Sequence, residues 1–218
     1  MVHFQKVSIL QVLLDIFRAW NWFFGIFIIA VCGIFIALWL SSKILATFLL
    51  FMLLGVITRY PAARSPYDLS LIKPLTILLC VFDFRVAAFY ALATWWVARF
   101  WNPVEEMTYT IAESISITAT ALTSPLLFAL AHNNLITFTL YFLLVHFILS
   151  ACVLTPIQRP ASLVSDFVFN VTEFMFTIFY NSLLILVLAG PFLNFFGIEN
   201  WNVGAFSQIT SIFTRNSS

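Results

Sequence analysis

Titratable side chains inside long apolar runs are the residues of this sequence that could do chemistry. An ionisable group at the centre of a bilayer costs about 2.5 to 3.5 kcal/mol on insertion scales, so each one there needs a partner or a task. The candidates are Asp83, Arg85, Glu113, His146 and Glu173. Arg85 and His146 lie near the middle of their runs, and the other three lie nearer the ends. Because histidine changes charge near neutral pH, His146 could act as a relay between carboxylates.

Polar residues at helical spacing surround two of these candidates. One set is Glu113, Ser116, Thr120 and Ser124, and the other is Asn170, Glu173, Thr177 and Asn181. Residues three or four apart share one face of a helix, and small residues let membrane helices approach closely. We therefore expect both faces to line a shared polar interior, with Asn181 as a sixth candidate. Asp83 and Arg85 are two apart, point in different directions and need partners on other helices, for which Glu113 or Glu173 could serve Arg85.

Two interpretations of this interior stay open. In one, Arg85, Glu113, His146 and Glu173 line a path for protons, ions or a small solute. In the other, the same groups hold the bundle together through interhelical salt bridges and hydrogen bonds, each contributing about 1 kcal/mol. An intramembrane enzyme using Glu113, His146 or Glu173 as acid and base is a third possibility, and it would need a shared cavity.

Signatures of catalytic, metal and haem sites are missing from the sequence. It has no GxSxG, HExxH, Walker loop or GxGxxG, and its cysteines and histidines do not cluster at metal-ligand spacing. His132 and His146 would differ in depth by roughly 20 Å on regular helices, so a bis-histidine haem site within the chain is not expected. We predict no catalytic residues, no metal and no cofactor, but bound lipids.

The composition says which elements must position these residues. Of 218 residues, 62% are hydrophobic and 9% are charged, whereas a soluble domain is about 45 to 50% apolar and about 25% charged. So few polar residues cannot cover a water-exposed globule. Net charge is +1, without a run of like charges, which argues against nucleic acid as a partner. The sequence therefore predicts an all-α polytopic transmembrane helix bundle.

A spanning helix needs about 20 mostly apolar residues. That length predicts about six spans, over residues 20–40, 44–57, 75–97, 109–131, 135–154 and 167–188, the last ended by Gly190 and Pro191. Residues 1–19 are expected to form an amphipathic interfacial helix, residues 20–196 the bundle and residues 197–218 a polar tail. The break at residues 41–43 is the weakest boundary, and the alternative is one long tilted helix through residue 57.

Lys and Arg counts on the loops give an orientation. One side would hold Lys6, Arg18, Arg59, Arg64, Lys73 and Arg215, and the other Lys43, Arg99 and Arg159. This bias predicts that both termini face the cytoplasm, or the matrix of a mitochondrion.

The function class follows from surface chemistry. Aromatic residues make up 18% of the chain and suit broad contacts with lipid and neighbouring subunits. We predict an accessory, structural subunit of a larger membrane complex, of the energy-transducing respiratory type, in the mitochondrial inner membrane and without catalytic activity of its own. Its partners would be membrane lipids and other membrane subunits. The alternative is a small channel or secondary transporter with a polar pathway among the third to sixth helices.

Overall fold

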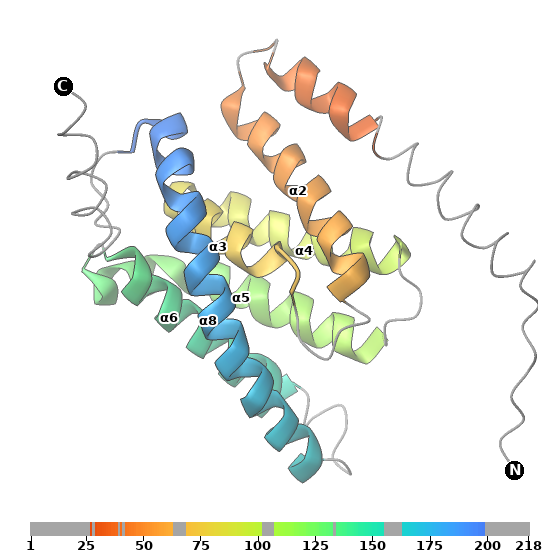
Figure 1. Ribbon diagram of the computed structural model, residues 1–218, viewed down its shortest axis with the longest axis vertical. Coiled ribbons are helices and arrows are strands. Elements are labelled where there is room, and N and C mark those ends of the chain that lie inside the picture. Colours follow the sequence, from red (N-terminus) through yellow and green to blue (C-terminus); the bar gives the residue numbers. More distant parts are fainter. Residues whose placement is uncertain are drawn as a thin grey trace, which may run out of the picture. The chain divides into compact units, whose positions relative to one another are not determined.

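The computed structural model describes residues 27, 29–38, 40, 42–62, 69–101, 107–132, 134–154 and 163–198, and this part of the chain is helical, without a strand. The helices are α2 (Lys43–Ala62), α3 (Ile72–Phe82), α4 (Phe84–Trp101), α5 (Met107–Ala131), α6 (Leu135–Phe147), the π-helix η1 (Ile148–Leu154) and α8 (Leu163–Phe196) (Figure 1). A shorter apolar helix, Ile29–Leu38, precedes them. The chain forms two compact units, Met1–Leu53 and Leu54–Ser218, and the helices from α3 to α8 belong to the second.

Three of the described helices are long and apolar enough to cross a membrane. They cover Met107–Ala131, Leu135–Leu154 and Val171–Phe196, and they correspond to the fourth, fifth and sixth predicted spans. The prediction of an all-helical chain with long apolar helices is thus confirmed for the described residues, whereas the count of six spans stays a prediction. The interfacial helix predicted over residues 1–19 lies outside the described residues, as does the predicted tail beyond residue 198.

The sixth span does not end where the sequence predicted. α8 continues through Gly190 and Pro191 to Phe196, because an apolar environment gives freed backbone groups no water to bind and favours continuing the helix. It stops at Gly197, which has a φ of 68°. The amide of Ile198 donates to the carbonyl of Leu193 at 3.0 Å, as in a glycine-ended helix C-terminus.

The predicted third span, residues 75–97, is two helices instead of one. α3 ends at Asp83, whose backbone is extended at φ −153° and ψ 115°. Its side-chain Oδ1 accepts hydrogen bonds from the amides of Arg85 at 2.7 Å and Val86 at 3.4 Å. Asp83 is therefore the N-cap of a new helix, α4.

α3 and α4 fold back on each other as a helical hairpin. Lys73, at the start of α3, contacts Glu113 near the start of α5. Trp95, near the end of α4, packs edge-on against Tyr109 in the same part of α5, with ring centroids 6.1 Å apart. The first turn of α3 and the last turns of α4 therefore lie at the same end of the bundle, and the two helices pack side by side (Figure 1).

α3 is a half-length helix enclosed by its neighbours. Its 11 residues extend about 16 Å, against about 27 Å for the 18 residues of α4. Every residue from Ile72 to Cys80 is buried, in packing against α4, α5 and α8. Helices this short inside a membrane protein are typical of re-entrant segments.

The segment leading into α3 is non-helical and is held by side chains. The Leu69 carbonyl accepts a hydrogen bond from the Tyr180 hydroxyl at 2.8 Å, and the Leu71 amide donates to Thr58 Oγ1 at 2.9 Å. Ser70, between them, is only 1% exposed. Backbone groups outside a helix need hydrogen-bond partners where water is scarce, and Thr58 of α2 and Tyr180 of α8 supply them here.

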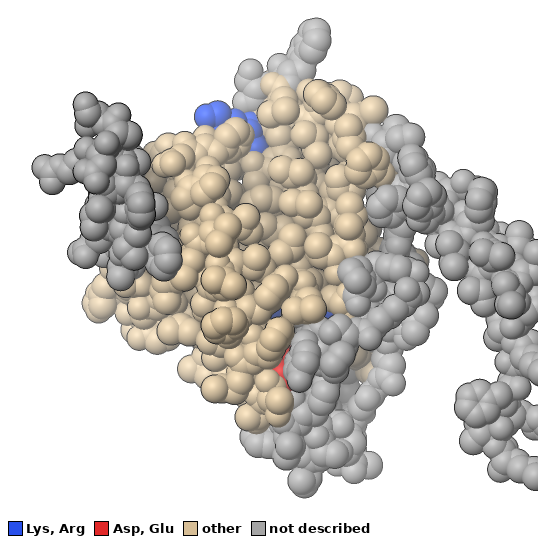
Figure 2. Space-filling model, in the orientation of Figure 1, with Lys and Arg blue, Asp and Glu red and all other residues tan. Residues whose placement is uncertain are grey.

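The outward faces of the long helices are apolar. On α8 the exposed residues Met175, Phe179, Leu183 and Val187 recur every four positions, as on a helix with one side toward lipid. Figure 2 shows that charged side chains form only small patches on one face of the described surface. The opposite stripe of α8, which includes Thr177, Asn181 and Ile185, is buried.

Candidate functional site

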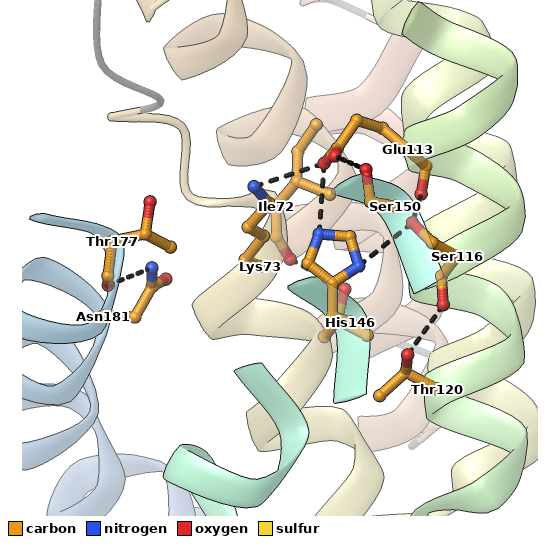
Figure 3. A network of polar contacts seen from close by, with 10 residues as sticks. Ile72, Lys73, Glu113, Ser116, Thr120, His146, Ser150, Thr177 and Asn181 are labelled. Atoms are coloured by element: carbon orange, nitrogen blue, oxygen red, sulfur yellow. Dashed lines mark hydrogen bonds and ion pairs between the residues drawn. The ribbon is translucent and has the colours of Figure 1, made fainter. Parts of the chain in front are cut away.

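The most polar part of the interior is a cluster of charged side chains from α3, α5 and α6. Lys73, Glu113 and His146 are 5, 5 and 4% exposed. Glu113 Oε2 lies 3.2 Å from Lys73 Nζ and 3.1 Å from His146 Nε2. Ser150 of η1 donates a hydrogen bond to the other oxygen, Oε1. Figure 3 shows these side chains converging on the Glu113 carboxylate, so both of its oxygens are engaged.

The helix directions explain why these residues meet. Glu113 lies six residues after Met107, the first residue of α5, or about 9 Å along the axis. α5 and α6 are joined by a short turn in which Asn134 caps α6 by accepting from the Thr137 amide at 3.0 Å. α6 therefore runs back along α5, and its last turn, with His146, reaches the level of Glu113.

A π-helix continues α6 directly after His146. η1 covers Ile148–Leu154, and its i→i+5 hydrogen bonding makes each turn wider than in an α-helix. His146 and Ser150, four residues apart, thereby both reach the Glu113 carboxylate. π-helical turns occur frequently at functional sites.

His146 bridges Glu113 and Ser116 through its two ring nitrogens. Nδ1 lies 3.1 Å from Ser116 Oγ, which is also 3.0 Å from the main-chain oxygen of Glu113 and can donate to it. When Ser116 donates to that oxygen, Nδ1 carries a proton and donates to Ser116. The remaining proton then lies either on His146 Nε2 or on Glu113 Oε2. Because the same heavy-atom positions suit both, a proton can pass between the two side chains without a rearrangement.

The same positions also fit an ionised Glu113 beside a neutral His146. When Ser116 instead donates to Nδ1, neutral His146 donates from Nε2 to the Glu113 carboxylate, and Lys73 balances the negative charge. Further along α5, Thr120 donates to the Ser116 carbonyl at 2.7 Å, a local bond of the kind serine and threonine make within helices. The site is thus centred on Glu113 and His146.

Further charges lie around Tyr109, one helical turn before Glu113. The buried Arg59 guanidinium stacks over the Trp95 ring at 4.4 Å and lies 5.6 Å from the Tyr109 ring centroid. Glu173, on α8, acts electrostatically on Tyr109 together with Glu113, Arg59 and Lys73. Two cations and two carboxylates therefore gather at one end of α5.

Asn181 on α8 is a buried polar group of a different kind. It is 1% exposed, and its Nδ2 donates to the Thr177 carbonyl at 2.7 Å. No donor among the described residues hydrogen-bonds its Oδ1. A buried acceptor left in this state costs about 1 to 3 kcal/mol. In Figure 3 the side chain points from α8 toward Ile72 and Lys73.

The structure separates the six candidates taken from the sequence. Glu113 and His146 are in contact, Asn181 is buried on the inward face of α8, and Glu173 is half-buried. Asp83 is a helix cap. Arg85 is exposed, 5.4 Å from the Phe84 ring centroid, and the structure does not bring it to Glu113 or Glu173, because it starts α4 at the end far from Tyr109.

Lys73 and Ser150 are site residues that were not among the six candidates. The polar composition of residues 59–73 predicts a loop that includes Lys73, although Pro74 follows it and proline is favoured in the first turn of a helix. Pro74 therefore indicates that the helix begins before it and includes Lys73. For Ser150 the signal is its position four residues after His146, which puts both side chains on one face of a helix.

Metal ligands do not gather in the described part of the chain, where no three His, Cys, Asp or Glu side chains come together. In the cluster, the cation beside Glu113 is the Lys73 ammonium. Comparison with protein families, with curated proteins and with solved structures finds no match to this chain. Its function therefore has to be inferred from the cluster itself.

Proposed function

We propose that this chain is a small secondary transporter or channel that moves protons, with Glu113 and His146 as the groups that carry them. One observation supports this above all. The buried His146 ring joins Ser116 to the Glu113 carboxylate, so a proton has a place on either titratable group. Chains of ionisable side chains inside a membrane protein are typical of proton relays.

The composition of the cluster favours transport over simple adhesion between helices. A Lys–Glu pair alone would neutralise both charges, and a buried pair is often no more stabilising than apolar residues of the same volume. His146 adds a third titratable group whose partner is already neutralised by Lys73. Such an excess of titratable groups at membrane depth is typical of proton pathways.

The hairpin of α3 and α4 gives independent support. Transporters commonly build their sites from membrane helices that are broken at mid-depth. Here Lys73 lies in the first turn of the half-length α3, directly after the non-helical residues 69–71. The charged cluster is thus located where a half-length helix begins after non-helical backbone.

Proton flux in liposomes tests the proposal. Purified protein is reconstituted into liposomes that contain a pH-sensitive dye. The pH of the external buffer is then changed, and the internal pH is followed. We expect flux above that of protein-free liposomes, and a drop of about 100-fold in Glu113→Gln and in His146→Phe, as for loss of a general acid or base. Arg85→Leu, at the exposed start of α4, is the matched control and should conduct like the unsubstituted chain. Absence of flux in the unsubstituted chain would refute the proposal.

A second proposal keeps the accessory subunit of a larger, respiratory-type membrane complex. Large exposed aromatic side chains support it, among them Phe89 at 64%, Phe100 at 84% and Phe179 at 69% exposure, since such side chains suit contact with other subunits as well as lipid. Extraction from its native membrane in mild detergent should then give a particle far heavier than 24.9 kDa. Recovery of the monomer alone would count against this role.

A further inference from the structure

The buried Oδ1 of Asn181 needs a hydrogen-bond donor, and no described residue supplies one in this structure. The residue is almost fully enclosed. Buried polar atoms in native proteins are nearly always hydrogen-bonded, so an exception calls for an explanation. A donor that visits this oxygen in another state of the protein is one such explanation.

Asn181 lies level with the first turn of α3. The adjacent Tyr180 donates to the Leu69 carbonyl, just before α3 begins. At the other end of α3, Phe82 packs against Phe196, the last residue of α8, with ring centroids 4.5 Å apart. α3 and α8 therefore run side by side in the same direction, which puts Asn181 opposite residues 71–73.

Lys73 is the donor best placed to reach it. A lysine ammonium has three donors on a flexible four-carbon stem, and one of these faces Glu113 Oε2. Side chains of a helix point back toward its N-terminus, so from the first turn of α3 the stem can turn toward α5 or toward α8. Figure 3 shows Lys73 between Glu113 on one side and Asn181 on the other.

We infer that Lys73 is a two-position switch that bonds Glu113 while that carboxylate is ionised and moves to Asn181 Oδ1 when Glu113 is protonated. Protonation removes the negative charge that Glu113 presents to the ammonium, whereas the Asn181 amide stays neutral throughout and remains available as an acceptor. The other charged groups toward this end of the bundle are His146, Arg59, Arg99 and Glu173. Of these, His146 bonds the same carboxylate oxygen and supplies or removes its proton.

The switch would couple proton uptake to the packing of α8. In one state Lys73 ties α3 to α5, and in the other it ties α3 to α8. This inference rests on the proposed transport function for its purpose, but the movement of Lys73 can be measured without any transport. Asn181 is a positioning residue in this scheme, since it does not itself receive a proton.

Solid-state NMR of the full chain in lipid bilayers tests the movement directly. With lysine labelled by ¹⁵N and asparagine by ¹³C, we expect no dipolar contact between Lys73 Nζ and Asn181 Cγ in the unsubstituted chain above pH 8. The contact should appear in Glu113→Gln, which imitates the protonated acid, and disappear again in the double variant Glu113→Gln, Asn181→Leu. No contact in Glu113→Gln, or an equal contact in the unsubstituted chain, would overturn the inference.

A second variant keeps the test informative where Glu113→Gln fails to fold. Asn181→Asp puts a carboxylate at the same position and leaves Glu113 intact. It should draw Lys73 to residue 181, seen as a contact from Nζ to the aspartate carboxyl carbon. Because Glu113 still competes for Lys73, we expect the contact in part of the molecules, and its complete absence would overturn the switch.

Flux measurements separate this inference from the proposed function. Asn181→Leu should lower proton flux about tenfold, the size of a typical coupling between sites, while the melting temperature stays the same or rises because a buried unpaired oxygen is removed. Ser182→Ala is the matched control, since it removes a neighbouring unpaired buried oxygen on α8 and should leave flux unchanged. Unchanged flux in Asn181→Leu refutes the switch alone, whereas no flux in the unsubstituted chain refutes the transport proposal alone.

Discussion

Glu113 is the residue on which the buried cluster depends. Lys73 and His146 share its Oε2, and Ser150 donates to its Oε1. Removing one member of a buried ion pair leaves an uncompensated charge and costs about 3 to 5 kcal/mol, whereas replacing both by apolar residues is often neutral. Single and double substitutions can therefore measure how much the cluster contributes to the free energy of unfolding.

We expect Glu113→Leu to lower the free energy of unfolding by about 3 to 5 kcal/mol, because it removes the carboxylate that pairs with the buried Lys73 ammonium. The double variant Lys73→Met, Glu113→Leu should recover most of that loss. Reversible unfolding in mixed detergent micelles measures both. A double variant as unstable as the sum of the single ones would mean that the two side chains do not interact.

The helices themselves show what the apolar pattern does and does not predict. The sequence predicts the fourth and fifth spans at residues 109–131 and 135–154, and they are observed as Met107–Ala131 and Leu135–Leu154, because apolar length alone sets a spanning helix. Hydropathy carries no direction, so the apolar residues on both sides of Asp83 predict a single span. Aspartate is also one of the residues preferred at a helix N-cap, and Asp83 has that role here.

The candidate site was predictable only in part, for a related reason. Helical spacing placed Glu113 and Ser116 on one face, but the partner of that face depends on how the chain folds back. Lys73 reaches Glu113 because α3 reverses at Asp83, and Arg85 is left exposed by the same reversal. Contacts between distant segments of this kind are set by tertiary packing, which a local pattern does not contain.

Substitution by alanine should change the stability of the protein in opposite directions at two glycines, Gly55 and Gly190. A Cβ on Gly55 of α2 would lie 2.8 Å from both Thr94 Cγ2 and the Tyr90 hydroxyl, two buried side chains of α4, so Gly55→Ala should destabilise the protein by about 1 to 3 kcal/mol through overpacking. Gly190 of α8 has nothing within 4 Å of such a Cβ. Gly190→Ala should stabilise by about 0.5 to 1 kcal/mol, since glycine weakens a helix interior.

Thermal unfolding of the two variants in the same detergent measures these effects. Gly190→Ala is the control for any general effect of an added methyl group in a membrane helix. If Gly55→Ala were as stable as the unsubstituted chain, the close approach of Gly55 to α4 would be contradicted.

At the scale of the whole molecule, the hairpin changes the expected membrane topology. One continuous span over residues 75–97 would put Arg59 and Arg99 on opposite sides of the membrane. Instead Arg59 stacks on Trp95, and Arg99 follows four residues later in the same helix. The hairpin thus moves Arg99 to the same end as Arg59 and changes the count of six basic residues against three, and the orientation of the termini stays a prediction.

Cysteine labelling can establish the topology. In a chain whose own cysteines are replaced, Leu69→Cys and Thr108→Cys should react with a membrane-impermeant maleimide from the same side, because both ends of the hairpin lie at one end of the bundle. His132→Cys, in the turn after α5, should react only from the other side. All three positions are exposed. Labelling of positions 69 and 108 from opposite sides would restore the single span.

The half-length α3 has a consequence for how the chain is synthesised. Eleven residues are too few for a spanning helix of their own, and the Glu113 carboxylate that pairs with Lys73 is made only forty residues later in the sequence. α3 should therefore enter the bilayer late, by docking against α5 after that helix has inserted. Nascent chains arrested before α5 should leave α3 open to added protease, and longer ones should protect it.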